Sequence, residues 1–291
     1  MIRVNPKIDI VFRKLFGSEE NKDILRAFIN SILPEKEQIA SLEIKNPYNL
    51  ASYVRSKGNI LDIKAQAADG RLFDVELQVG EQTFFGKRIK YYIDKMYVDQ
   101  LEVSGLYSSL KKVIGVALLD FDYFSDTRHV RGITYKDIDT NETYDLINLS
   151  DIYFIELRKF KKELKDISTA LDRWITFLNK AHEYDKDKIP PELSVDENVG
   201  NAIKKLDVMY LSKDEREIYE AEQKKRLDSL EEIMTAETKG REKGREEGEK
   251  LKAIEIATNL IAAGMTSEQI ALITGLVPSE LEKIVAEKPV K

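Results

Sequence analysis

The residues in this sequence that could do chemistry are mainly acids and amides, and three of them lie close together in one short segment. The segment DIKAQAADGRLFDVELQ places Asp62, Glu76 and Gln78 on two stretches that alternate between polar and apolar residues. Such alternation is typical of β-strands with one buried face. Carboxylate and amide oxygens are the ligands that hard cations such as Mg²⁺ or Mn²⁺ prefer. This predicted hairpin is therefore the first candidate for a functional site.

The turn between the two stretches determines which side chains face each other. A two-residue turn would mix polar and apolar side chains on each face of the hairpin. A three-residue loop that ends at Gly70, with Gly70 in the left-handed conformation, instead pairs Asp62 with Glu76 and Lys64 with Asp74. This register puts every apolar side chain on one face. It also makes Asp62 and Glu76 direct cross-strand neighbours, with Cβ atoms about 4.5–5.5 Å apart.

Two interpretations of this pair of acids follow from the pattern. Like charges opposite each other destabilise a sheet unless a cation lies between them. One interpretation is a divalent metal site made by Asp62 and Glu76, with the amide of Gln78 on the same face. The other is a solvated polar face on which Lys64 and Arg88 offset the negative charge. The pattern alone favours neither.

The composition disfavours several other kinds of site. The 291 residues contain no cysteine and only two histidines, so thiolate chemistry and histidine-based metal sites have little basis, and no G-x-S-x-G motif is present. The stretch GEQTFFGKR resembles a phosphate-binding loop. However, five residues rather than four separate Gly80 from Gly86, and Arg88 stands where a Ser or Thr would hold Mg²⁺. An ATP-dependent enzyme is therefore disfavoured.

The segments around the hairpin predict an α/β core. Their order is helix, helix, three strands, helix, strand, and the first helix is expected to begin at Asn5. The last of these strands, VIGVALLDF, is apolar on both faces, as expected for a strand in the middle of a sheet. Further strands and a helix that contains Trp174 should follow. The predicted strands are residues 41–45, 59–67, 72–79 and 113–121, and the helix before the last strand is residues 83–105.

The C-terminal part has a different composition. From about residue 213 the sequence is dense in charge, as in KGREKGREEGEK, which predicts a solvated helix or a loosely ordered linker. The residues after it contain three helix signals separated by glycines. We therefore expect a core domain at 1–212, a charged helical linker at 213–252 and a small helix-turn-helix-like module at 253–291. The charged helix is a candidate surface for homo-oligomer formation, although its heptad pattern is too irregular to assign a coiled coil.

Charge and hydropathy limit the expected partners and location. The formal net charge is −6, which argues against non-specific coating of nucleic acid but allows a locally basic surface. No stretch approaches the roughly 18 apolar residues of a membrane-spanning helix, and the N-terminus lacks a signal-peptide pattern. We expect a cytoplasmic protein with no membrane partner, in agreement with the lack of cysteine.

Taken in order, these segments resemble the PD-(D/E)xK nuclease core, and more specifically the recombination-promoting nuclease (Rpn) family of transposase-like proteins. The likeness spans nearly the whole chain. It implies a restriction-endonuclease-like fold, with a mixed central sheet flanked by helices and a C-terminal helical extension. It also implies a Mg²⁺- or Mn²⁺-dependent endonuclease that acts on double-stranded DNA and is linked to recombination or transposition. The segments that carry it are NPKIDIVFRKLFG, GNILDIKAQAADGRLFDVELQV, RIKYYIDKMYVDQLEVSGLYSSLKKVIGVALLDF, IYFIELRKF and DRWITFL.

The resemblance assigns roles to the hairpin residues. Asp62 and Glu76 correspond to the metal-binding acids, and Gln78 takes the place of the motif lysine. Gln78 can orient a water molecule but carries no charge, so proton removal would depend on the metal. Lys64 and Arg88 are candidates to stabilise charge on the phosphate. The alternative function is a catalytically weak or inactive nuclease-fold protein that acts as a DNA- or protein-binding module.

The resemblance also points to residues outside the hairpin. Asp9, on the first predicted helix, matches an N-terminal acid of the family, although Arg13 four residues later offers a simple ion-pair explanation. Arg88 and Tyr92 match an accessory position on the helix that follows the hairpin. These three residues complete the predicted site.

Overall fold

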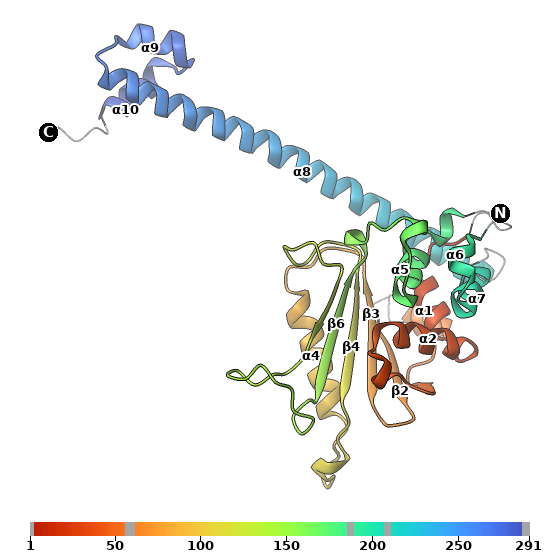
Figure 1. Ribbon diagram of the computed structural model, residues 1–291. Helices are drawn as coiled ribbons and strands as arrows, with labels where there is room; N and C mark the ends of the chain where they lie inside the picture. Colours follow the sequence, from red (N-terminus) through yellow and green to blue (C-terminus); the bar gives the residue numbers. More distant parts are fainter. Residues whose placement is uncertain (1–2, 56–61, 185–188, 207–210, 287–291) are drawn as a thin grey trace. The chain divides into compact units, whose positions relative to one another are not determined.

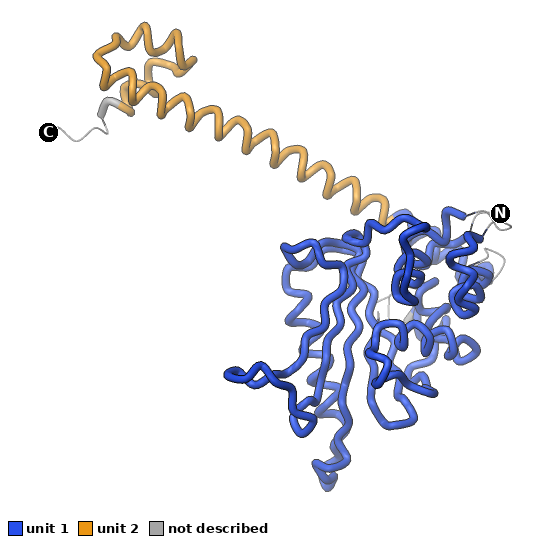
Figure 2. The backbone as a smooth tube through the Cα atoms, in the orientation of Figure 1, with its two compact units in different colours: residues 1–224 blue, residues 225–291 orange. Residues whose placement is uncertain are grey.

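The chain consists of two compact units, residues 1–224 and residues 225–291 (Figure 2). The computed structural model describes residues 3–55, 62–184, 189–206 and 211–286. The first unit contains the predicted hairpin, and the second contains the C-terminal helices.

The described part of the first unit is built on a six-stranded mixed sheet with the strand order β1-β2-β3-β4-β6-β5. The first two neighbouring pairs are antiparallel, β3, β4 and β6 run parallel, and β5 returns antiparallel at the edge. β4 lies in the interior and is buried along its whole length, which confirms the prediction for this strand. The strands are β1 (Leu42–Ile44), β2 (Asp62–Ala67), β3 (Leu72–Gln78), β4 (Val113–Leu119), β5 (Val130–Ile133) and β6 (Ser150–Glu156).

Helices cover both faces of this sheet (Figure 1). α1, α2, α5 and α7 pack on one face around the rings of Phe16, Phe28 and Trp174, with the Trp174 ring 5.8 and 5.6 Å from those of Phe16 and Phe28. α4 covers the other face. The helices of this unit are α1 (Asp9–Gly17), α2 (Lys22–Ile32), α3 (Leu50–Arg55), α4 (Phe85–Val98), α5 (Ala170–Lys180), α6 (Pro191–Ser194), α7 (Glu197–Lys205) and the start of α8 (Lys213–Ala262).

The distance between α4 and the sheet depends on a glycine in β4. A Cβ atom at Gly115 would lie 2.4 Å from Cδ1 of Ile93, which is closer than real side chains approach. Glycine therefore allows α4 to pack directly on the middle of the sheet. This close packing places the N-terminal turns of α4 beside the end of β3.

Two predicted helix bounds need correction. The first helix begins at Asp9 rather than just after Asn5, because the side chain of Asn5 accepts a hydrogen bond from the Lys7 amide and closes a separate turn. α4 ends at Val98 rather than near residue 105. The apolar residues beyond that point, such as Val103, are exposed and do not continue the buried stripe. Residues 59–61 of the predicted first strand of the hairpin lie outside the described residues.

The second unit comprises most of α8 and two short helices, α9 (Ser267–Thr274) and α10 (Pro278–Ala286). Thr266 and Gln269 form a capping box at the start of α9, and Gly275 ends this helix with φ = 72°. The charged segment is an exposed part of α8, which runs unbroken through residue 252. The predicted division at residues 212 and 252 stays a prediction. None of the described helices is both long and apolar enough to cross a membrane.

Candidate active site

The β2–β3 hairpin has the register that the sequence predicts. Asp62 lies opposite Glu76, and Lys64 lies opposite Asp74. Gly70 has φ = 91°, the left-handed conformation that the three-residue loop requires. The acids are therefore brought together by the turn and by the alternation of the two strands.

The acidic face of the hairpin is turned toward α4. The apolar side chains that alternate with the acids, such as Ile63 and Val75, belong to the core on the opposite face of the sheet. Glu76 and Gln78 are buried, whereas the side chain of Asp62 keeps 19% of its exposure. The face is therefore not solvated at Glu76. The solvated interpretation is nevertheless correct that Lys64 and Arg88 form ion pairs with the two acids.

Arg88 on α4 contacts two of the predicted site residues. Its guanidinium donates to Glu76 Oε1 and to Gln78 Oε1, the latter at 2.7 Å. Burial raises the pKa of the Glu76 carboxyl, and the charge of Arg88 opposes that rise. Gln78 also donates from Nε2 to the carbonyl oxygen of Gly80 at 2.9 Å, so both ends of its amide are held. The second ion pair joins Lys64 Nζ to Asp62 Oδ2 at 3.3 Å.

Asp74 is a third acid of this face that the sequence analysis did not select. Its side chain is buried, and neither carboxylate oxygen accepts a hydrogen bond from the residues that the structure describes. Burial and the negative charge of Asp62 raise the pKa of Asp74 to about 8. The signal was present in the sequence, because Asp74 stands two residues before Glu76 and so shares its face. The predicted cross-strand pairing of Asp74 with Lys64 is confirmed, but the Lys64 ammonium forms its ion pair with Asp62.

The oxygen atoms of this face fit a divalent cation. Glu76 Oε2 and both oxygens of Asp74 are buried without a donor among the described residues, and buried oxygens in this state favour a cation or a proton. Within the described ranges, three or more acidic or histidine side chains do not converge on one point in the way a complete protein cage would need. Mg²⁺ is commonly held by one or two carboxylates together with water and phosphate oxygens. Asp62 and Glu76 match that arrangement.

Asp9 belongs to a neighbouring cluster at the junction of α1, α3 and α8. The hydroxyl of Tyr53 lies 2.7 Å from Asp9 Oδ2 and also contacts the carboxylate of Glu222. A phenol has one proton, so two carboxylates can bond to it together only if one of them is protonated. The cluster is linked to the hairpin by Arg13, which lies close enough to lower the pKa of Asp9 and donates to the Asp62 carbonyl oxygen at 3.1 Å.

Tyr92 lies on α4, one turn beyond Arg88. Its described ring contact is with Tyr91, at a centroid distance of 5.7 Å, and 38% of the residue is exposed. Among the described interactions, Tyr92 therefore has no contact with the carboxylates of the acidic face.

The family of the chain follows from a comparison with protein-family models. The model described as PD-(D/E)XK nuclease family transposase matches residues 6–236. The chain belongs to this family. The comparisons with curated proteins and with solved structures give no match.

The match covers the whole of the first unit apart from its first residues, including the hairpin, α4 and the start of α8. The predicted fold class is thereby confirmed as a PD-(D/E)XK fold, with a mixed sheet between helices and a C-terminal helical extension. Under the predicted correspondence of Asp62 and Glu76 with the two acids of the motif, Gln78 stands where the family's name has Lys.

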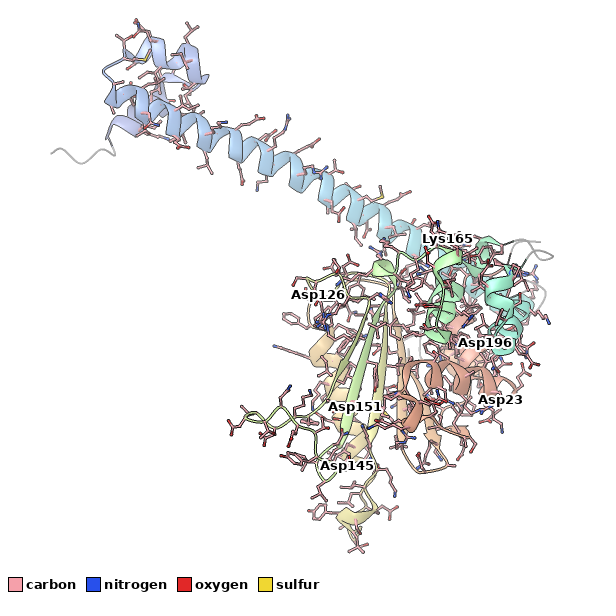
Figure 3. The ribbon with its side chains drawn as sticks, viewed as in Figure 1. Asp23, Asp126, Asp145, Asp151, Lys165 and Asp196 are labelled. Atoms are coloured by element: carbon pink, nitrogen blue, oxygen red, sulfur yellow. The ribbon has the colours of Figure 1, made fainter. Side chains whose placement is uncertain are left out.

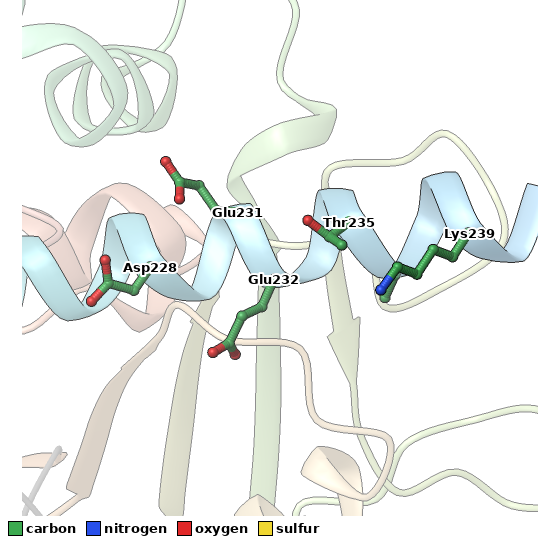
Figure 4. Close-up of a pocket in the computed structure, with 6 residues that line it drawn as sticks. Asp228, Glu231, Glu232, Thr235 and Lys239 are labelled. Carbon is green, nitrogen blue, oxygen red and sulfur yellow. The ribbon is translucent and has the colours of Figure 1, made fainter.

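Two surface hollows of the described residues are not lined by the hairpin acids. One is lined by residues of α8 alone, including Asp228, Glu232 and Lys239, and Figure 4 shows these side chains pointing outward from a single helix. The other lies near the start of α8 and is lined in part by Tyr48 and Glu215. A hollow with only one wall cannot enclose a ligand, so the hollow on α8 alone is not a candidate site.

The cluster around Asp9 should make the stability of this PD-(D/E)XK protein depend on pH. Burial raises the pKa of Asp9 from 3.8 to about 7, and the charge of Glu222 adds to the rise. Between about pH 4 and 7 the unfolded chain loses this proton while the folded protein keeps it, so the folded state becomes less stable as pH rises. We expect Asp9→Asn to raise the melting temperature by at least about 4 °C at pH 8 and by much less at pH 4.5.

The matched control for this prediction is Asp23→Asn. Asp23 lies on the surface of α2, with 73% of its side chain exposed (Figure 3). Thermal unfolding of both variants at pH 4.5, 6 and 8 gives the comparison. An Asp9→Asn effect of equal size at all three pH values would show that the ionisation of Asp9 is not its cause.

Proposed function

We propose that this protein is a metal-dependent endonuclease that hydrolyses phosphodiester bonds in double-stranded DNA. The observation that carries the proposal is the cross-strand pair of Asp62 and Glu76, on a largely buried face where Glu76 Oε2 and both carboxylate oxygens of Asp74 lack donors among the described residues. Membership of a nuclease family supports a phosphodiester as the target.

The residues of the face divide the work of hydrolysis. Asp62 and Glu76 hold Mg²⁺ or Mn²⁺. A metal bound there lowers the pKa of water and offsets charge on the phosphate. Gln78 orients the attacking water through its amide. Arg88 and Lys64 are the cations that stabilise the negative charge that develops on the phosphate.

Gln78 is suited to orientation rather than to proton transfer. Arg88 holds its oxygen and the Gly80 carbonyl holds its nitrogen, so the amide has one fixed direction. Because an amide does not titrate in this range, Gln78 does not act as a general base. Hydrolysis is therefore expected to be slower than with lysine at this position.

Asp9 acts on the site indirectly, through Arg13. Arg13 lies close to Asp9 and donates to the carbonyl oxygen of Asp62. We assign Asp9 the role of a positioning residue that fixes Arg13 and, through it, the start of β2. Tyr92 takes an accessory role beside Arg88.

Nicking of supercoiled plasmid by the full chain tests the proposal. We expect conversion to the open circular form with Mg²⁺ or Mn²⁺ and no conversion with EDTA. A folded protein that nicks plasmid with neither ion would contradict the proposal. A folded protein that nicks equally well in EDTA would contradict the role of the metal.

The second candidate function is a binding module without catalysis. The observation that favours it is the ion pair between Arg88 and Glu76, which satisfies one oxygen of a metal-binding acid within the protein. A metal that binds the folded state raises the melting temperature. Absence of any shift with Mg²⁺ or Mn²⁺ would favour this candidate.

A further inference from the structure

The exposed surface of α4, with its N-cap residue Phe84, carries aromatic side chains near the proposed site. Phe84 is 69% exposed, Tyr91 is 64% exposed and Tyr92 is 38% exposed. Large aromatic rings contribute most when they are buried, so an exposed group of them indicates a surface that contacts a partner.

The spacing of these rings places them on either side of Arg88. Phe84 is the N-cap residue of α4, and Arg88 and Tyr92 follow it at four-residue intervals, a spacing that places helical side chains on the same side. At a rise of 1.5 Å per residue, the positions of Phe84 and Tyr92 are about 12 Å apart along the helix axis. The core-facing side of α4 is a different one, formed by Phe85, Ile89 and Ile93. We call Phe84, Tyr91 and Tyr92 the α4 aromatic row.

The row continues directly into the proposed active site. Arg88 lies between its members and donates to Glu76 and Gln78. Whatever molecule places a phosphate beside Arg88 therefore also lies against these rings.

The row combines rings with positive charge. Lys87 Nζ lies 5.3 Å from the centroid of the Phe84 ring, and the rings of Tyr91 and Tyr92 meet edge to face. Aromatic rings that alternate with cations bind single-stranded nucleic acid, because bases stack on the rings while the cations neutralise phosphates. A paired duplex hides the faces of its bases, whereas an unpaired strand presents them.

We propose that the α4 aromatic row binds the bases of unpaired nucleotides, so that the preferred DNA has a single-stranded segment next to the scissile phosphate. The inference rests on the proposed function for the identity of the partner as DNA. It adds the form of the substrate, namely duplex DNA with a flap, gap or melted segment.

Fluorescence anisotropy in EDTA tests this inference without hydrolysis. The probes are a blunt duplex, a single strand of the same sequence and the same duplex with an unpaired flap. We expect the wild-type chain to bind the single strand and the flap at least about tenfold more tightly than the blunt duplex. One stacked base contributes about 5- to 150-fold in affinity.

The variant that tests the row is Phe84→Ala/Tyr92→Ala, with Tyr107→Ala as the matched control. Tyr107 is 81% exposed but lies in the turn after α4, away from the row. The double variant should bind all three probes with similar affinity, close to that of the wild type for the blunt duplex. Tyr107→Ala should keep the wild-type preference. Circular dichroism of each variant confirms that it is folded.

Equal affinity of the wild-type chain for the three probes would overturn the inference, as would a preference that survives in the double variant. A different outcome would assign the row to a protein contact. In that case the wild-type chain binds the three probes equally and self-associates, and the double variant no longer self-associates. Because the measurement needs no metal, a preference for unpaired DNA without nicking would contradict only the proposed function. Nicking without that preference would contradict only the inference.

Discussion

Replacing Glu76 by Gln is expected to reduce metal-dependent nicking by at least about 100-fold. The substitution keeps the size of the side chain and removes its charge. Asp62 then faces a neutral partner across the hairpin, and the divalent ion loses one of its two carboxylates. Since a loss of about 3 kcal/mol corresponds to about two orders of magnitude in rate, even a partial loss of metal binding gives this effect.

Glu43→Gln is the matched control for this variant. Glu43 lies on β1 of the same sheet, but its side chain is 69% exposed and pairs with Lys45. We expect the control to nick at the wild-type rate. Initial nicking rates at several Mg²⁺ concentrations give the comparison. Wild-type rates for Glu76→Gln would remove this hairpin from the mechanism.

The second large effect is a loss of stability, which we expect for Arg88→Met in EDTA. Glu76 is 3% exposed and Arg88 provides its positive partner, so the substitution leaves a buried carboxylate without a counter-charge. Breaking a buried ion pair in this way costs about 3–5 kcal/mol. Two features reduce this cost, because a quarter of the Arg88 side chain is exposed and Glu76 can take up a proton. We therefore expect the substitution to lower the free energy of unfolding by about 2 kcal/mol.

Addition of Mg²⁺ should reverse part of this loss. In the wild type a metal at Glu76 competes with the guanidinium, whereas in Arg88→Met it replaces the missing charge. The variant should therefore gain more stability from Mg²⁺ than the wild type does. Urea unfolding with EDTA and with Mg²⁺ measures both quantities. An equal gain in the two proteins would show that Arg88 and the metal do not share Glu76.

Arg128→Met serves as the control for loss of an arginine. Arg128 pairs with Asp126, which lies in the loop between β4 and β5 (Figure 3), and 64% of the Arg128 side chain is exposed. Exposed pairs contribute little to stability. Its unfolding should stay close to that of the wild type in both buffers.

The register of the hairpin could be predicted from the sequence because two local signals agree. The alternation along the two strands allows one pairing that keeps apolar residues together, and Gly70 supplies the positive φ that this pairing needs. The position of Arg88 near the acids was expected both from the charge pattern, as a cation that offsets them, and from the resemblance. The hydrogen bonds of Arg88 with Glu76 and Gln78 could not be predicted from the sequence, because they depend on how closely α4 packs on β4 at Gly115.

Other parts of the site have no local signal. The cluster of Asp9, Tyr53 and Glu222 joins residues that lie up to 213 positions apart, and no spacing in the sequence connects them. Because Glu222 lies beyond the predicted boundary at residue 212, the sequence analysis assigned it to the charged linker and not to the core domain. The burial of Asp74 is similar, because alternation gives the face of a side chain but not the depth at which a helix covers it.

The central claim is that Asp62 and Glu76 hold a divalent ion, and the most direct measurement is the position of Mn²⁺ in crystals grown with this ion. An anomalous difference map at the manganese absorption edge locates the metal independently of any assay. We predict a peak between the two carboxylates, within about 2–2.5 Å of an oxygen of each. A map without a peak there, from crystals in which both side chains are ordered, would contradict the claim.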